Sequence, residues 1–484
     1  MSPDARPIER AFQRLREELE IRTPFPPEAE REAEAAARRV ASPGPDRVDR
    51  TEVPFVTIDP PGSRDLDQAL RIERDGEGFR LWYAIADVGF FVDRGGAVEA
   101  EAWLRGLTVY APDRRDPLYP PVLGQGAASL LADETRPAVL FGLTMDADAN
   151  VTASTVERAL VRSRAQLTYA QALEHAEGGT LFEKEEWADT LTLLKTFGEL
   201  RRAREAERGG VSLPIRDQHV QHTAAARLGY ELAYEEPNAA EEWNAQVSLL
   251  TGHVAALRMV EAKVGMVRTL APAEEERVAA FRRAARALGF PWPEGTPYAA
   301  FIRSLDLRHP CLVPLMWQAR RVTRGADYVA FDGEAPEDPL HHALAMPYAH
   351  VTAPLRRLAD RYVLDLLVEL ENGKRPTPAE VETLKKLPKV MDEAERKEGR
   401  MERGAVDIAE AFLLRGRVGE TFPATVLGVK NREAEVQIED PPVRVSAARP
   451  KDAPWLDLGQ RATVRLAGVD VEAGKLNFVL EPSA

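Results

Sequence analysis

Hydrophobic residues recur first with a helical period, then with the period of strands, then with a helical period again, and with the period of strands at the end of the chain. This succession predicts an α+β protein in three parts: a small helical module over 1–50, a central domain over 51–415 and a small β-barrel over 416–484. In the central domain we expect a mostly antiparallel sheet packed with helices.

The N-terminal part contains two helical patterns, from Ile8 to Leu19 and from Pro27 to Val40, with a proline-rich connector over 23–27 between them. The hydrophobic residues of the first pattern fall on one face, which is typical of a helix that docks on a larger body. The alternative is a helix-turn-helix that binds nucleic acid, for which this connector is long.

Shorter patterns predict the elements of the other two parts. We expect strands at 55–58, 79–88, 140–145 and 151–161, and helices at 189–208, 242–264, 273–288, 354–370 and 378–414. After residue 422, short segments of alternating hydrophobic and polar residues are separated by turn signals, which is typical of an OB-fold barrel.

The composition is that of an ordinary globular protein: of 484 residues, 44% are hydrophobic and 29% are charged. The net charge of −14 argues against a protein that coats nucleic acid with its whole surface, but it leaves room for a basic channel inside an acidic shell. The single cysteine, Cys311, cannot form an intramolecular disulfide. Since we find neither a signal peptide nor an apolar run long enough to cross a bilayer, we expect a cytoplasmic protein without a membrane partner.

The segment 56–70 brings three carboxylates together at the end of a predicted strand: Asp59, Asp65 and Asp67. Pro60-Pro61-Gly62 predicts a turn, and if the following residues are extended, Asp65 and Asp67 share one face that can fold back towards Asp59. Three such carboxylates repel one another, and a hard divalent cation such as Mg²⁺ relieves the repulsion. The pattern therefore favours metal-assisted phosphoryl transfer, with an acidic surface turn as the alternative interpretation.

Several motifs, taken in their order along the chain, resemble the catalytic RNB domain of the ribonuclease II family over roughly residues 50 to 415. The motifs are Thr57-Ile-Asp-Pro with Arg64-Asp-Leu-Asp, Tyr83-Ala-Ile-Ala-Asp-Val, Arg105-Gly-Leu-Thr-Val-Tyr-Ala-Pro-Asp-Arg, Ser163-Arg-Ala-Gln-Leu-Thr-Tyr and Tyr348-Ala-His-Val-Thr-Ala-Pro-Leu-Arg-Arg. This family degrades RNA processively from the 3′ end, and the C-terminal strands are similar to the OB-type RNA-binding domain that closes such enzymes. The usual front end is two cold-shock domains, which the first part cannot hold, so we expect a shortened member.

The resemblance implies a metal site. Asp59, Asp65 and Asp67 match the first three of the family's four aspartates, whereas Gln68 stands at the fourth position. Asp67 stands where the family has its metal-positioning and activating carboxylate. Because an amide offers a carbonyl oxygen but no negative charge, we expect one Mg²⁺ to be held firmly by these four residues and a second to be recruited with the substrate.

Arg356 matches the family's catalytic arginine. We expect Thr352 to cap a helix that runs through Arg356, with Pro354 in its first turn, so that the arginine and the helix amides together hold the scissile phosphate. The alternative is that Arg356 or Arg357 is a solvated charge of that first turn. Around this motif the chain departs from the family, since Leu358 stands where a tyrosine is usual and Leu364-Asp365 replaces a His-Arg pair.

The resemblance also implies substrate contacts. Tyr110 and Tyr169 match aromatic residues that contact the 3′-terminal nucleotides, where stacking is worth about 1–3 kcal/mol per base, although each could equally be a core aromatic. Glu402 matches a glutamate that lines the family's channel, with Glu395 as a competing alignment. The histidines at 341, 342 and 350 are expected to be structural.

These observations lead to one hypothesis: a Mg²⁺-dependent, monomeric 3′-to-5′ exoribonuclease that hydrolyses single-stranded RNA processively to nucleoside 5′-monophosphates. The first alternative is a catalytically weak RNA-binding or regulatory protein on a ribonuclease fold, for which Gln68 and the altered surroundings of Arg356 are the evidence. The second is a metal-dependent phosphodiesterase that acts on DNA or small nucleotides.

Overall fold

A six-stranded sheet forms the centre of the larger part of the molecule. The computed structural model describes residues 6–213, 218–222, 229–234, 238–306, 308–309, 311–322, 325–430, 432–450 and 456–481. The strands of the sheet are β1 (Val48–Asp49), β2 (Phe55–Ile58), β3 (Gln68–Asp75), β4 (Gly78–Ala86), β7 (Thr135–Met145) and β8 (Val151–Leu167). Their order is β1-β8-β2-β3-β4-β7, and β8 also pairs with β7, so the sheet closes on itself.

The direction of the strands follows the prediction. β8 runs parallel to β1 and β2, and the other neighbours are antiparallel. The short β2 is buried over its whole length, which explains why its residues are hydrophobic apart from the buried Thr57. The sequence patterns did not predict β3, which begins directly after the acidic motif. The mostly antiparallel sheet packed with helices is confirmed.

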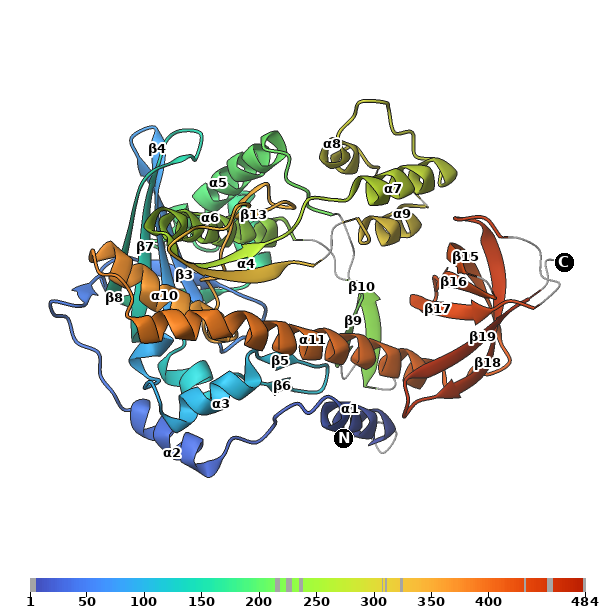
Figure 1. Cartoon of the computed structure of the whole chain (residues 1–484), viewed down its shortest axis with the longest axis horizontal. Coiled ribbons are helices and arrows are strands. Elements are labelled where there is room, and N and C mark those ends of the chain that lie inside the picture. The colour runs from blue at the N-terminus through green and yellow to red at the C-terminus, as the bar shows by residue number, and fades with distance from the viewer. Residues whose placement is uncertain are drawn as a thin grey trace.

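Helices cover this sheet (Figure 1). They are α3 (Ala97–Arg105), α4 (Tyr169–Ala176), α5 (Ala188–Glu207), α6 (Ala239–Ala262) and α10 (Leu358–Glu371), with two short helical turns, η2 (Val88–Phe90) and η3 (Leu123–Ala127). α5 packs on β3 and α6, whereas α10 packs on β8. The predicted helices at 189–208 and 242–264 agree with α5 and α6 to within three residues.

Short strand pairs surround this core. They are β5 (Val109–Tyr110) with β6 (Arg115–Asp116), β9 (Gln218–His222) with β10 (Tyr230–Tyr234), β11 (Val264–Thr269) with β12 (Asp327–Asp332), and β13 (Leu340–His341) with β14 (Met346–Pro347). All four pairs are antiparallel.

The C-terminal part is a closed barrel in the order β15-β16-β17-β19-β18, which confirms the predicted OB-type fold. Its strands are β15 (Thr421–Lys430), β16 (Glu433–Ile438), β17 (Val443–Ala448), β18 (Arg461–Asp470) and β19 (Lys475–Leu480). Buried and exposed residues alternate along β17, as a barrel wall requires. The long α11 (Pro378–Leu414) runs from the sheet to this barrel, and its last residue, Leu414, lies in the barrel core (Figure 1).

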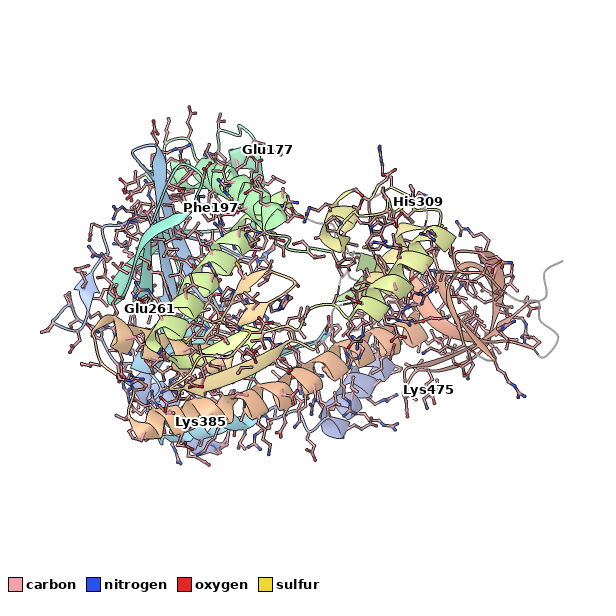
Figure 2. The ribbon with its side chains drawn as sticks, turned by 45° about the horizontal axis from the view of Figure 1, so that its top comes forward. Glu177, Phe197, Glu261, His309, Lys385 and Lys475 are labelled. Atoms are coloured by element: carbon pink, nitrogen blue, oxygen red, sulfur yellow. The ribbon has the colours of Figure 1, made fainter. Side chains whose placement is uncertain are left out.

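A small helical unit lies between the two parts. It consists of α7 (Glu275–Ala287), α8 (Tyr298–Arg303) and α9 (Leu312–Ala319), and its own core includes Trp292 stacked on Phe301 with ring centres 4.2 Å apart. α9 packs against β15 of the barrel. In Figure 2, His309 of this unit lies above Lys475 of the barrel and across the view from Phe197 of α5.

Both N-terminal helices dock on the body. α1 (Arg6–Glu18) buries Ile8 and Phe12 against Ile408 and Phe412 of α11, and α2 (Pro27–Ala36) packs on α3. The face that the sequence predicted as a docking stripe is therefore the face that packs. In the described part of the chain, no helix combines the length and the apolar composition needed to cross a membrane.

A close approach fixes the segment that leads to Arg356. A Cβ atom added at Gly252 of α6 would lie 2.3 Å from Cε2 of Tyr348 and 2.5 Å from the carbonyl oxygen of Ala349. The Ala349 N–H donates to the Gly252 carbonyl at 3.1 Å. Because glycine has no side chain, residues 348–349 can run directly against α6.

We therefore expect Gly252→Ala to lower the free energy of unfolding by about 1–3 kcal/mol, because a ring and a backbone carbonyl would both have to move. Thermal unfolding of the purified protein measures the loss. Gly399→Ala in α11 is the matched control, since the nearest atom to its added Cβ is Nη1 of Arg403, a flexible side-chain end, at 3.2 Å. The control should be neutral or stabilising by up to about 1 kcal/mol, and equal losses in the two variants would contradict the packing argument.

Candidate active site

Backbone hydrogen bonds hold Asp59 and Asp67 at one end of β2 and β3. The Asp59 N–H donates to the Leu167 carbonyl at 2.9 Å, and the Ala86 N–H donates to the Asp67 carbonyl at 2.9 Å. Between them the chain turns at Gly62, whose φ of +80° lies in the left-handed region that favours glycine. The predicted turn therefore brings Asp59, Asp65 and Asp67 to the same edge of the sheet.

Asp67 is the most deeply placed of the three, with 4% of its side chain exposed. Its Oδ1 accepts the Leu355 N–H at 2.7 Å, and its Oδ2 lies 3.4 Å from Nε of Arg356. Burial raises the pKa of Asp67 to about 7, although Arg356 and the Leu355 amide act to lower it. Its charge therefore depends closely on the positive groups around it.

Asp59 has a buried oxygen without a hydrogen-bond partner. This atom, Oδ2, is buried and is unpaired among the described residues. Burial, and next the negative charge of Asp65, raise the pKa of Asp59 to about 7, whereas Arg356 acts to lower it. Since a buried polar atom without a partner is costly, Asp59 is an acceptor that suits a cation.

Asp65 is paired with a different cation. Its Oδ1 lies 2.6 Å from Nη1 of Arg115, and its Oδ2 accepts the Tyr110 O–H at 3.0 Å. Both partners belong to the β5–β6 hairpin, in which Tyr110 and Arg115 are directly opposite each other. Asp65 therefore ties this hairpin to the acidic motif.

Gln68, the first residue of β3, is half-buried, and its side-chain nitrogen donates to the Thr352 carbonyl. This bond joins the acidic motif to the segment that carries Arg356. With the nitrogen engaged, the side-chain carbonyl oxygen is the atom that remains for a metal ion.

The described ranges contain no group of three or more His, Cys, Asp or Glu side chains that could hold a metal ion. Mg²⁺ nevertheless needs few protein ligands when waters and a substrate phosphate complete its shell. The unpaired Oδ2 of Asp59 and the raised pKa values of Asp59 and Asp67 fit a divalent cation, because its charge would stabilise both carboxylates in the ionised form. Asp59 and Asp67 are therefore the residues that would hold such a cation.

The predicted helix start around Arg356 is wrong. α10 begins at Leu358, and its N-cap is Arg357 in an extended conformation rather than Thr352. Arg356 lies instead in a separate turn, in which the N–H groups of Arg356 and Arg357 donate to the Ala353 carbonyl at 3.2 and 2.9 Å. The turn does not continue into the helix because Arg357 pairs with Leu107 in a β-bridge.

The two neighbouring arginines have different surroundings. Arg357 forms three hydrogen bonds to the buried Asp360, at 3.0, 3.2 and 2.8 Å, and Asp360 also accepts the Ala353 N–H at 2.8 Å. Arg356 keeps 48% of its side chain exposed while its Nε faces Asp67. Arg357 thus holds the turn, and Arg356 is the arginine with N–H groups open to a ligand.

A pocket of about 260 Å³ opens beside Arg356. Its walls include Tyr110, Arg356, His350, and Glu395 and Glu398 of α11. Burial, then the charges of Glu402 and Glu395, raise the pKa of Glu398 to about 7. Glu395, the competing alignment, therefore lines the pocket, whereas Glu402 is exposed farther along α11, and its predicted substrate contact stays a prediction.

The two predicted tyrosines both lie near the carboxylates. Tyr110 is 41% exposed and lines the pocket, so its ring is open to a base. Tyr169 is half-buried and is the first residue of α4, behind a Thr168–Gln171 capping box. Burial, and next the charge of Asp59, raise the pKa of Tyr169, which places it beside that carboxylate. Their roles with substrate stay predictions.

His350 and His342 form side-chain hydrogen bonds, whereas the buried Nδ1 of His341 has no hydrogen-bond partner among the described residues. Nδ1 of His350 lies 2.6 Å from the Tyr328 hydroxyl, and Nε2 of His342 lies 2.7 Å from Oδ2 of Asp338. Burial, with the charges of Arg357 and Arg268, lowers the pKa of His350 well below its usual value, so its ring is neutral at pH 7.

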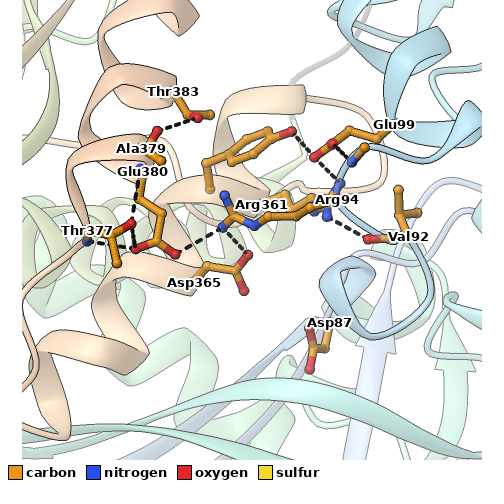
Figure 3. Close-up of polar contacts among 12 residues, drawn as sticks. Asp87, Val92, Arg94, Glu99, Arg361, Asp365, Thr377, Ala379, Glu380 and Thr383 are labelled. Atoms are coloured by element: carbon orange, nitrogen blue, oxygen red, sulfur yellow. Dashed lines mark hydrogen bonds and ion pairs between the residues drawn. The ribbon is translucent and has the colours of Figure 1, made fainter.

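The departure at Leu364-Asp365 lies in an ionic network on α10 (Figure 3). Asp365 lies 2.6 Å from Arg158 and 3.3 Å from Arg94, and Arg94 also lies 3.9 Å from Glu380 at the start of α11. In the same view Arg361 of α10 donates to the Val92 carbonyl at 2.6 Å. These contacts tie α10 to α11, β8 and the segment after η2.

Sequence patterns missed several groups of the site. The Leu355 amide leaves no local signal, because its partner Asp67 is far away in the chain, whereas the Arg357–Asp360 pair has an i, i+3 spacing that the sequence shows. Glu395, Glu398 and Glu402 follow the i, i+3 and i+7 spacing of one helix face, and this spacing could have identified the acidic wall from the sequence.

Comparison with protein families gives two matches. The RNB domain matches residues 47–373, and the RNase II-type exonuclease C-terminal S1 domain matches residues 420–481. Ribonuclease R of Escherichia coli is 28% identical over 417 residues, which cover 81% of this chain and 50% of that protein. Ribonuclease R of Aquifex aeolicus is 28% identical over 420 residues, covering 81% and 56%. The chain thus spans about half the length of these relatives.

Solved structures show the same fold at lower identity. The chain is similar to Mycoplasma genitalium RNase R in complex with ribose methylated single-stranded RNA, with a TM-score of 0.85 and 19% identity over 97% of this chain and 77% of that one. It is also similar to yeast Ssd1, a pseudonuclease, with a TM-score of 0.68 and 16% identity over 92% and 54%.

The carboxylates predict a pH-dependent cation affinity. With pKa values raised to about 7, Asp59 and Asp67 are largely protonated below pH 6 and ionised above pH 8 in the metal-free protein. Since a cation binds the ionised form, we expect the Mg²⁺ affinity to rise about 10- to 100-fold from pH 6 to pH 8, with release of protons at pH 7. Calorimetric titration in buffers of different ionisation enthalpy counts these protons. Asp59→Asn should reduce the count, the surface variant Asp146→Asn should not, and an affinity independent of pH would contradict the assignment.

Proposed function

Because this chain belongs to the RNB-domain family, we propose that it is an exoribonuclease that shortens single-stranded RNA from the 3′ end and releases nucleoside 5′-monophosphates processively. The observation that carries the proposal is the pairing of Asp67 with the half-exposed Arg356, beside the unpaired carboxylate oxygen of Asp59. This arrangement lies next to a pocket in which a nucleotide can meet Tyr110.

The reaction requires a positive group on the phosphate and an oriented water. In our proposal Arg356 donates two N–H groups to oxygens of the scissile phosphate and offsets the negative charge that builds in the transition state. Asp67, held by the Leu355 amide through Oδ1, presents Oδ2 to the attacking water. The turn at 353–357 keeps both groups in place, because Arg357 and Asp360 lock it to α10.

The metal proposal is one Mg²⁺ held mainly by Asp59 and Asp67, with a second recruited together with the substrate. The cation would supply positive charge to the phosphate and increase the acidity of water at the site. Asp65 and Gln68 have other partners, Arg115 and the Thr352 carbonyl, and we propose them as weaker ligands.

The 3′-terminal nucleotide would stack on Tyr110, whose hydroxyl is fixed on Asp65. Tyr169 would support the neighbouring nucleotide from the side of Asp59. Stacking suits RNA of any sequence because every base has a π-face.

A catalytically weak RNA-binding protein is the second candidate. The observation that favours it is Gln68, a neutral amide bonded to Thr352 where the family has a metal-binding carboxylate. The first experiment below separates the two candidates.

We expect Asp67→Asn and Arg356→Ala each to lower the rate of RNA hydrolysis about 10²-fold or more, because the first removes the carboxylate that orients the attacking water and the second removes the group that holds the phosphate. The measurement is a time course on a 5′-labelled RNA with a single-stranded 3′ tail in Mg²⁺. Arg356→Lys keeps the charge without the bidentate fork and should recover only part of the rate. Arg202→Ala, an exposed arginine paired with Glu242, is the matched control and should behave as the wild type.

Gln68→Asp extends the same time course. If the amide limits metal binding, this variant should shorten RNA faster and at a lower Mg²⁺ concentration than the wild type. RNA that is bound but never shortened by the wild type, with cleavage only in Gln68→Asp, would instead identify a binding protein on a nuclease fold.

Two substitutions at Tyr110 distinguish the contribution of ring stacking from that of the hydroxyl hydrogen bond. Tyr110→Ala should weaken binding of the RNA 3′ end by about 1–3 kcal/mol, because it removes the ring. Tyr110→Phe keeps the ring and loses only the bond to Asp65, so most of the affinity should remain. Binding is measured with a fluorescent RNA in the Asp67→Asn background, in which cleavage is slow. Equal affinities in all three proteins would argue against the stacking role.

A further inference from the structure

The β5–β6 hairpin has an active-site face and a docking face. Tyr110 is opposite Arg115, and Val109 is opposite Asp116. Because side chains alternate between the two faces of a strand, the first pair points to Asp65 and the second pair points away from it. The bonds to Asp65 at 3.0 and 2.6 Å lie on the first face.

The docking face is held by α1. Arg16 of α1 has 1% of its side chain exposed, and its Nε donates to Oδ2 of Asp116 at 2.7 Å. Its Nη1 and Nη2 donate to the two oxygens of Asp113, in the turn of the hairpin, at 2.8 and 2.7 Å. Beside this ion cluster, Leu19 packs with Val109 and with Met401 of α11.

The hairpin cannot hold its own shape. Each strand has two residues, and even a longer isolated hairpin is marginal in water. In the turn, the Ala111 N–H donates to the Arg114 carbonyl at 3.1 Å. The position of Tyr110 and Arg115 therefore depends on what the docking face binds.

We propose that Arg16 is a positioning residue of the active site, which fixes the hairpin through Asp113 and Asp116 and thereby holds Tyr110 and Arg115 against Asp65. The catalytic consequence rests on the proposed function, whereas the positioning itself does not. Arginine is suited to this place because its planar guanidinium serves two carboxylates along two edges, which a lysine cannot do.

A second set of contacts also fixes the β5–β6 hairpin to the N-terminal segment. Directly after α1, Arg22 forms two bonds of 2.8 Å with Glu101 of α3, and Arg105 at the end of α3 lies 2.9 Å from the same carboxylate. Arg105 also donates to the carbonyl of Pro117, just after β6, at 3.0 Å. Residues 16–22 thus hold the hairpin at its turn and at its base.

Hydrogen exchange of the full chain, free of RNA and metal, tests the positioning directly. We expect Arg16→Gln to speed exchange over residues 107–118 about tenfold or more, while β3 and β4 exchange as in the wild type. Asp113→Asn should give the same local effect, which keeps the test valid if Arg16→Gln does not fold. Arg14→Gln, which removes an exposed arginine paired with Glu18 on the same helix, is the matched control and should leave exchange unchanged. Exchange at 107–118 that stays at the wild-type rate in both Arg16→Gln and Asp113→Asn would overturn the proposal.

A kinetic cycle tests how Arg16 acts. Arg16→Gln should lower kcat/KM for a single-stranded RNA about tenfold or more, and Arg16→Lys should recover part of the loss. In a Tyr110→Ala/Arg115→Ala background, Arg16→Gln should have no further effect on kcat/KM, because both side chains through which it acts are already removed. If Arg16→Gln lowered kcat/KM by the same factor in that background as in the wild type, Arg16 would not act through Tyr110 and Arg115, and the proposal would be overturned. If the wild type does not hydrolyse RNA, the proposed function fails, and the exchange experiment alone decides the positioning.

Discussion

The site depends on the withdrawal of two carboxylates, Asp59 and Asp67, from water. A buried carboxylate is costly unless it is paired or hydrogen-bonded, and burial raises the pKa of both residues to about 7. The chain offsets part of this cost for Asp67 with the Leu355 amide and Arg356, but it leaves Oδ2 of Asp59 unpaired. Two carboxylates in such an environment are stabilised by a positive charge, which a bound cation would supply. The two buried carboxylates lower the stability of the ligand-free protein, and a positively charged ligand would stabilise them.

The positions of these groups come from segments that are far apart in the chain. The acidic motif is joined to the turn at 353–357 by the Leu355 and Gln68 bonds, and that turn is joined to residues 106–108 through backbone hydrogen bonds. α11 adds an acidic wall with Glu395 and Glu398 to the pocket, which Arg356 and Arg357 also line. A bound phosphate would therefore be placed by Arg356 and repelled from the acidic wall, which restricts its orientation.

The N-terminal helix belongs to this network. Residues 1–50 precede most of the RNB domain in the chain, yet they contribute to its site. Arg16 is among the most deeply buried charged residues described, and it binds the hairpin that in turn binds Asp65. Two departures from the family, Gln68 and Asp365, differ in their distance from the site. Gln68 changes the charge of the metal site itself, whereas Asp365 takes part in ion pairs that connect α10 to its neighbours and does not reach Arg356.

The sequence by itself determined the α+β class, the barrel and the acidic motif, because hydrophobic periodicity and local motifs are properties of short segments, and the resemblance to a family supplied the other candidate residues. It predicted α11 and the turn at Gly62 for the same reason. Only the tertiary structure decided that Arg356 lies in a turn before α10 rather than in the helix, since the β-bridge of Arg357 with Leu107 is a long-range contact. The division of roles between Arg356 and Arg357, the pairing of Asp65 with Arg115, and the burial of Arg16 were likewise beyond local patterns. The partners of Arg356, Asp65 and Arg16 lie far away in the chain, at Asp67, Arg115 and Asp116, and spacing along the sequence does not contain that information.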